Sequence, residues 1–215
     1  MSRLEHRSQV SAGLGLRAHK GGAVVVCVAV AEGEPRVVIS TVLETCDEGD
    51  RLSFEPYRVA ADMARDAQGR ATAEAVAVVT EGRRRQAQLA TNSLRDIVRQ
   101  LEATSCKPVV AALLVNRAGW VTDLLEYSLG WPEHVPVAEG LAERDALRFA
   151  SSQCGIELVE LDEKSLMDLA TETLGMSSTE ISTRLKALGA PIGKPWRKEQ
   201  KLACLSAWIA VTRQR

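Results

Sequence analysis

The stretch GLGLRAHKGGAVVVCVAVAEGEPRVVISTVL, residues 13–43, decides the fold. It contains three runs rich in aliphatic and β-branched residues, at 14–16, 23–30 and 37–43. Two short glycine-containing breaks separate these runs. Such runs and breaks predict three consecutive strands joined by tight turns. The middle run is apolar almost without alternation, which is typical of a strand at the centre of a sheet with helices on both faces.

The rest of the chain alternates between helical and strand patterns. The region 56–102 is alanine-rich with helical spacing, and Gly69 and Gly82 are expected to divide it into two or three helices. Two further strands are expected at 109–115 and 156–161. Helices are expected at 121–129, 138–150, 165–174, 178–188 and 196–211, and Ser178 is expected to cap the fourth of these. The sequence therefore predicts an α/β domain: a central five-stranded mixed sheet, three antiparallel strands first, flanked by helices. Residues 1–11 are expected to form a flexible lead and residues 12–215 a single domain.

The composition limits the classes of protein to which this chain can belong. Hydrophobic residues make up 46% of the chain and charged residues 26%, as in a globular domain. The formal net charge is −1, so contact with nucleic acid would need a local basic patch. No apolar run reaches the roughly 18 residues of a membrane span. Five widely spaced cysteines without a Cys-x-x-Cys pair suit a reducing compartment. We expect a cytoplasmic protein that does not contact a membrane.

Both ends of the chain resemble a known family. Residues 14–24 resemble the first hairpin of RuvC-type resolvases, which read Leu-Gly-Ile-Asp-Pro-Gly at the strand end, and residues 198–210 resemble their closing helix. The element order is similar to that of the RNase H-like fold. Residues 138–150 and 195–208 also resemble a group of bacterial proteins in which the acidic residues of these nucleases are incomplete. The resemblance implies an RNase H-like domain with a function related to nucleic acids.

The resemblance also implies where catalytic acids would lie. RNase H-like nucleases hold Mg²⁺ or Mn²⁺ between carboxylates from the first strand, the end of the fourth strand and the last helix. The matching positions here are Arg17, Asn116 and Glu199. A cation, a neutral amide and one acid imply weak or absent nuclease activity. If the protein is an enzyme, the resemblance makes it a divalent-metal-dependent nuclease, with Glu199 as one catalytic residue and its metal ligands unknown.

A second group of acids lies near the start of one helix. Glu139 and Glu143 are four residues apart and share a helix face, and Asp145 follows. Such a group could hold a cation or act as acid and base, which makes Glu139 and Asp145 further catalytic candidates. The alternative is that these acids only complement the helix dipole.

Two groups of basic residues are candidate binding sites. Arg17, His19 and Lys20 follow the first strand and would suit an anion, although a histidine in a turn is often merely exposed. A second group surrounds the start of the last helix and would suit a phosphate-lined groove, or be a solvated helix start: Lys194, Trp196, Arg197, Lys198 and Lys201. Two functions fit these patterns. One is a nucleic-acid-binding domain, and the other is a non-catalytic domain that binds a protein or a small anion.

Overall fold

The five strands form one mixed sheet. The computed structural model describes residues 9–116 and 121–214. The strands are β1 (Val10–His19), β2 (Gly22–Ala31), β3 (Glu34–Glu44), β4 (Cys106–Val115) and β5 (Glu157–Asp162). They are arranged in the order β3-β2-β1-β4-β5, with β1, β2 and β3 antiparallel and β4 and β5 parallel to β1. The predicted fold class, with three antiparallel strands first, is confirmed.

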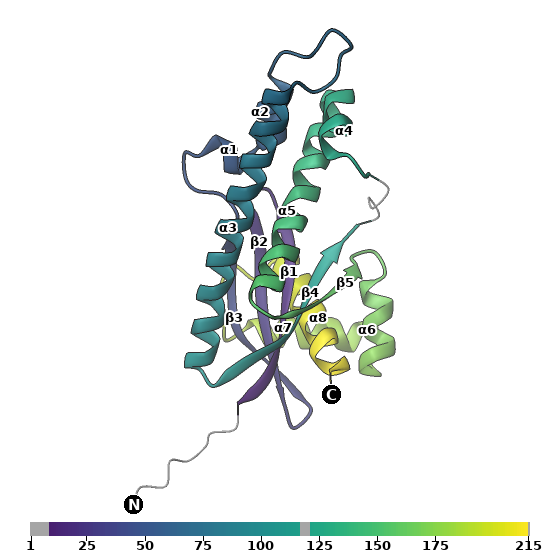
Figure 1. The fold of residues 1–215 in the computed structure, drawn as a ribbon. Coiled ribbons are helices and arrows are strands. Elements are labelled where there is room, and N and C mark those ends of the chain that lie inside the picture. The colour runs from purple at the N-terminus through teal and green to yellow at the C-terminus, as the bar shows by residue number, and fades with distance from the viewer. Residues whose placement is uncertain (1–8, 117–120, 215) are drawn as a thin grey trace, which may run out of the picture.

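Helices cover both faces of the sheet. They are α1 (Arg51–Phe54), α2 (Pro56–Ala61), α3 (Ala73–Ala103), α4 (Leu124–Gly130), α5 (Val135–Gln153), α6 (Leu166–Leu174), α7 (Ser178–Gly189) and α8 (Lys198–Arg213). Figure 1 shows α3 and α5 side by side along one face and the C-terminal helices on the other. Within the described ranges, no helix is both long enough and apolar enough to cross a membrane.

The apolar run of β2 is buried on both faces, as its pattern predicts. Val24, Val26 and Val28 pack into the core shared with α6, α7 and α8. Val25 and Cys27 pack into the opposite core, shared with α3 and α5. The turn into β2 uses Gly21 at a φ of 82°, a backbone conformation that side chains with a Cβ rarely adopt. Helices on both sides thus explain why this strand shows no alternation.

Gly13 and Gly15 allow α8 to lie directly on β1. A Cβ on Gly15 would be 1.7 Å from the carbonyl oxygen of Ala203, and one on Gly13 would be 2.5 Å from that of Ala207. The later helix residue faces the earlier strand residue, so α8 runs antiparallel to β1. The first turn of α8 therefore lies at the C-terminal end of β1, where the predicted site residues gather.

Several predicted boundaries were wrong. Gly82 does not interrupt the long helix, because α3 runs through it. The residue is instead a point of close packing, where a Cβ would meet the Pro56 side chain at 2.5 Å. The cap of α7 is Ser177 rather than Ser178, and it forms a full capping box with Glu180. Trp196 precedes α8.

The N-terminal boundary also differs from the prediction. Val10 and Ser11, which the sequence assigned to the lead, belong to β1, and the Val10 backbone N–H donates to the Ser105 carbonyl. The remainder of the predicted lead falls almost entirely on residues 1–8, outside the described ranges.

Candidate functional site

The end of β1 carries an ion pair where the resemblance would place a metal-binding aspartate. Arg17 lies two residues after Gly15 and so projects on the face covered by α8. Its Nε is 3.1 Å from Glu163 Oε2 and its Nη2 is 3.3 Å from Glu163 Oε1. This two-pronged contact neutralises the guanidinium and fixes its plane. Glu163 directly follows β5, so the pair links two strand ends across β4.

The other positions implied by the resemblance do not complete a metal site. Asn116 is exposed just after β4, and Glu199 lies half-buried in the first turn of α8. Among the described residues, no group of three His, Cys, Asp or Glu side chains is placed to hold a metal ion. Divalent metals at such sites need several oxygen ligands, and a cation at the central position opposes them. These residues therefore do not fit the two-metal centre of the fold's nucleases.

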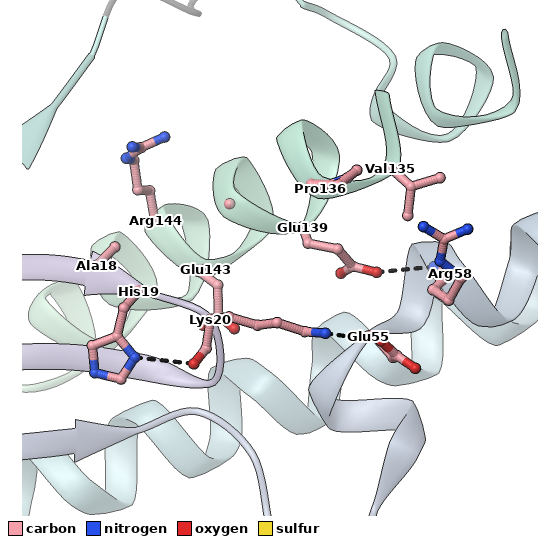
Figure 2. A pocket seen from close by; sticks show the side chains of 11 residues that line it. Ala18, His19, Lys20, Glu55, Arg58, Val135, Pro136, Glu139, Glu143 and Arg144 are labelled. Carbon is pink, nitrogen blue, oxygen red and sulfur yellow. Dashed lines mark hydrogen bonds and ion pairs between the residues drawn. The ribbon is translucent and has the colours of Figure 1, made fainter. Parts of the chain in front are cut away.

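A cavity of about 290 Å³ lies beside the β1–β2 turn. It is bounded by the turn, by the α1–α2 segment and by α5 (Figure 2). Its lining residues are Ala18, His19, Lys20, Glu55, Arg58, Val135, Pro136, Glu139, Gly140, Glu143 and Arg144. The structure thus brings together three predicted site residues, His19, Lys20 and Glu139, which come from distant parts of the sequence.

Glu143 ties the hairpin to α5. Its side chain is buried, and Oε1 accepts the Gly21 backbone N–H at 2.9 Å. Oε2 accepts the Thr45 hydroxyl at 2.5 Å. Burial raises the pKa of the Glu143 carboxyl to about 7, although both hydrogen bonds lower it. With both oxygens occupied by neutral donors, Glu143 positions the turn and has limited capacity for a ligand.

Glu139 is held by the backbone of α2. Its side chain is also buried, and Oε1 accepts the Arg58 backbone N–H at 2.9 Å. Oε2 is buried and has no hydrogen-bond donor. Burial raises the pKa of the Glu139 carboxyl to about 7, although the backbone N–H groups of Arg58 and Tyr57 lower it. The nearby Glu143 and Glu55 carboxylates add to the rise. A helix-dipole role does not account for either glutamate, because both are buried within α5 against other elements.

The predicted anion site is already largely neutralised. Arg17 pairs with Glu163, and Lys20 Nζ is 2.9 Å from Glu55 Oε2 and 4.1 Å from the centre of the Phe54 ring. His19 is exposed, with Nδ1 3.0 Å from the Lys20 carbonyl oxygen. Two of the three cations proposed from the sequence thus have carboxylate partners.

Asp145 lies outside the cavity, and Arg144, which lines it, points its side chain away from the two glutamates. Asp145 pairs with Arg83 and Arg148, each at 2.7 Å, and does not line the cavity with Glu139. Figure 2 shows the Arg144 side chain leaving α5 on the side opposite to the two glutamates. The structure therefore separates Asp145 from the acids with which the sequence grouped it.

The basic side chains of segment 194–201 are not neutralised by acidic side chains of the described residues. Lys194, Arg197, Lys198 and Lys201 form no ion pair with any described residue. Since α8 begins at the end of β1, these cations lie at the same end of the sheet as Arg17. Glu199 is the one acid in the segment.

Trp196 has a packing role within this segment. Its Nε1 donates to the Leu185 carbonyl at 2.9 Å, and its ring lies where a Cβ on Gly189 would be. We expect Trp196→Phe to lower the free energy of unfolding by about 1 kcal/mol, because the phenyl ring cannot donate this hydrogen bond. Urea denaturation measures this decrease. A change in ligand binding at unchanged stability would instead assign the ring to a binding surface.

Sequence reasoning missed the partners that define these sites. Glu163, Glu55, Arg58 and Thr45 were not singled out, because each acts through a contact with a distant element. The spacing of Glu139 and Glu143 was the available signal, and it correctly placed them on one face.

Comparison with known proteins agrees with the fold. No protein-family model matches the chain, and no curated protein sequence matches it. Thermus thermophilus RuvC superimposes with a TM-score of 0.52 at 12% identity, covering 94% of this chain and 95% of that one. The same protein in complex with Holliday junction substrate superimposes with a TM-score of 0.52 at 10% identity, covering 95% of each chain. The layout of the sheet and this similarity over nearly the whole chain identify an RNase H-like fold of the RuvC type.

Proposed function

We propose that this protein is an RNase H-like domain that binds nucleic acid through the basic segment 194–201 and does not cleave it by two-metal chemistry. The observation that supports the proposal is the set of four cations in this segment that have no carboxylate partner among the described residues. Lysine and arginine at such a surface bind phosphate and release counterions. They also provide the local patch that a chain of net charge −1 requires.

The ion pair at the end of β1 supports the proposal that the protein does not cleave nucleic acid. Ionised carboxylates at this position would hold the metals that generate hydroxide and stabilise the leaving oxygen. Arg17 instead occupies the position with its charge already matched by Glu163. We therefore derive no hydrolytic step for this site.

Branched DNA is the first ligand to test, because the structurally similar RuvC has been seen with a Holliday junction substrate. A fluorescent four-way junction and a linear duplex would be titrated with protein and followed by anisotropy. We expect binding that weakens strongly between about 50 and about 200 mM salt. The triple variant Lys194/Lys198/Lys201→Gln is expected to reduce the slope of log K against log salt by about 0.9 for each phosphate that it no longer neutralises.

The matched control is Lys107→Gln. Lys107 is an exposed lysine at the start of β4, the opposite end of the sheet, and its replacement should leave the slope unchanged. The same DNA would be incubated with Mg²⁺ and with Mn²⁺, where we expect no cleavage. An affinity that does not change with salt concentration, or no binding at all, would contradict the proposal that the protein binds nucleic acid. Cleavage abolished by Glu199→Ala would contradict the proposal that the protein does not cleave it.

A further inference from the structure

The acids that line the cavity beside the β1–β2 turn have little capacity left to accept from a ligand. Glu55 is paired with Lys20 and with Arg51. Both oxygens of Glu143 accept neutral donors from the protein. Glu139 is only 6% exposed and faces backbone N–H groups of α2. A ligand that offers only hydrogen-bond donors would therefore be poorly matched to this cavity.

The cations that line the cavity include two without an acidic partner. Arg58 and Arg144 form no ion pair with any residue in the described ranges. A guanidinium group has five N–H donors and binds a carboxylate or a phosphate through two parallel hydrogen bonds. The unused hydrogen-bonding capacity of the wall therefore favours an anion.

Arg58 is the better placed of the two arginines to hold a ligand. Figure 2 shows its guanidinium group beside Val135, at the end of the cavity away from Arg144. Its backbone N–H donates to Glu139 Oε1 at 2.9 Å, which fixes this turn of α2 against α5. The backbone of Arg58 is thus anchored, while its side chain is available to a ligand.

The shape of the cavity limits the size of the ligand. Its volume of about 290 Å³ is near the lower end of small-molecule sites, which span about 300–1,000 Å³. Ala18, Val135, Pro136 and Gly140 supply apolar wall. A short hydrocarbon group that ends in an anionic group matches both this wall and the guanidinium group.

We propose that this cavity binds a small organic anion, whose carboxylate or phosphate group accepts from the Arg58 guanidinium. No residue of the basic segment 194–201 lines the cavity, so the proposal does not rest on nucleic-acid binding. The variant Lys194/Lys198/Lys201→Gln should bind such an anion as the wild type does. Each of the two proposals can therefore fail without the other.

Calorimetric titration with butyrate and with n-butyl phosphate, at constant ionic strength, tests the proposal. 1-Butanol and n-butylamine serve as neutral and cationic probes of similar size. We expect saturable binding of the two anions and none of the other two probes. A difference in affinity between butyrate and n-butyl phosphate shows which of the two anionic groups the site prefers.

The affinity for both anions is expected to fall as the pH rises through about 7. Burial raises the pKa of the Glu139 and Glu143 carboxyls to about 7, so a higher pH adds negative charge next to the cavity. Glu139→Gln removes one of these charges and should make the fall less steep. The other titratable groups near the two acids or in the cavity lining are His19, Lys20, Cys46, Glu55, Tyr57, Arg58 and Arg144.

Two variants remove the site by different means. Arg58→Gln removes the guanidinium group but keeps the backbone N–H that Glu139 accepts, so anion affinity should fall at least about tenfold. Gly140→Leu adds a side chain to the lining where a Cβ meets nothing within 4 Å, so it should obstruct the cavity. Arg65→Gln is the matched control, because Arg65 is exposed and does not line the cavity, and it should bind like the wild type.

Several results would overturn the proposal. They are no saturable binding of either anion, equal binding of 1-butanol or n-butylamine, an affinity that rises with pH, or unchanged anion affinity in Arg58→Gln or in Gly140→Leu. An equal loss of affinity in Arg65→Gln would assign the effect to overall charge rather than to the cavity. Because the Arg58 side chain forms no ion pair within the described ranges, Arg58→Gln should match the wild type in urea denaturation, and its loss of binding is then not a loss of fold.

Discussion

Gly15→Ala is expected to cost about 3 kcal/mol or more of the free energy of unfolding. The added Cβ would lie 1.7 Å from the Ala203 carbonyl oxygen and 2.6 Å from the Ser206 Oγ. Neither backbone can yield locally, since β1 is the middle strand of the sheet and Ala203 lies within a buried segment of α8. The helix must therefore move off the sheet, which opens the core on that face. Urea denaturation followed by circular dichroism measures the destabilisation.

Gly140→Ala is the matched control for this substitution. Gly140 lies inside α5, and an added Cβ would meet nothing within 4 Å. Alanine favours the helix over glycine by up to about 1 kcal/mol, so this variant should be slightly more stable than the wild type. If Gly15→Ala were as stable as Gly140→Ala, the direct contact between β1 and α8 would be wrong.

The second large effect is a change in how stability depends on pH. Burial raises the pKa of Glu139 and of Glu143 from an ordinary value of 4.5 to about 7. The folded state then binds protons more tightly than the unfolded state. The stability that this provides is complete below about pH 4.5 and is lost as the pH rises through about 7. At roughly 1.4 kcal/mol per pKa unit, each carboxyl accounts for a decrease of about 3 kcal/mol.

Glutamine at both positions removes this titration. As the pH rises from about 4.5 to about 8, the stability of Glu139/Glu143→Gln relative to the wild type should increase by at least about 3 kcal/mol. This increase does not depend on how much the two proteins differ in stability at low pH. Urea denaturation across this range measures the difference. Glu180→Gln is a control of opposite sign, because hydrogen bonds from Ser177 hold the pKa of the exposed Glu180 below its usual value. A constant difference between the double variant and the wild type would mean that the two acids titrate normally.

Much of the architecture could be predicted because it depends on short-range patterns. The β-branched runs around two glycine turns specified the first three strands, and the unalternating run 23–30 specified burial on both faces. The error at Gly82 shows the limit of this reasoning. Glycine usually weakens a helix, but here it allows α1 and Pro56 to approach α3, a contact far apart in the sequence. Local preference cannot anticipate such packing.

The candidate sites were predictable only as residue types. Helical spacing correctly placed Glu139 and Glu143 on one face, and the basic character of 194–201 is plain from composition. The partners were not predictable, because Glu163 reaches Arg17 from another strand end and Thr45 reaches Glu143 from beyond β3. Trp196 looked like part of a binding patch but packs on α7.

The stretch 13–43 by itself determined the three-stranded opening of the sheet and the absence of an acid at position 17, since both follow from residue identity and local pattern. Only the tertiary structure decided what replaces that acid and which residues share a cavity. Arg17 is matched by a glutamate 146 positions away, and Glu139 is buried because the hairpin turn, the α1–α2 segment and α5 meet around it. Charge pairing and burial depend on which distant segments come into contact, and that information resides in the packed fold.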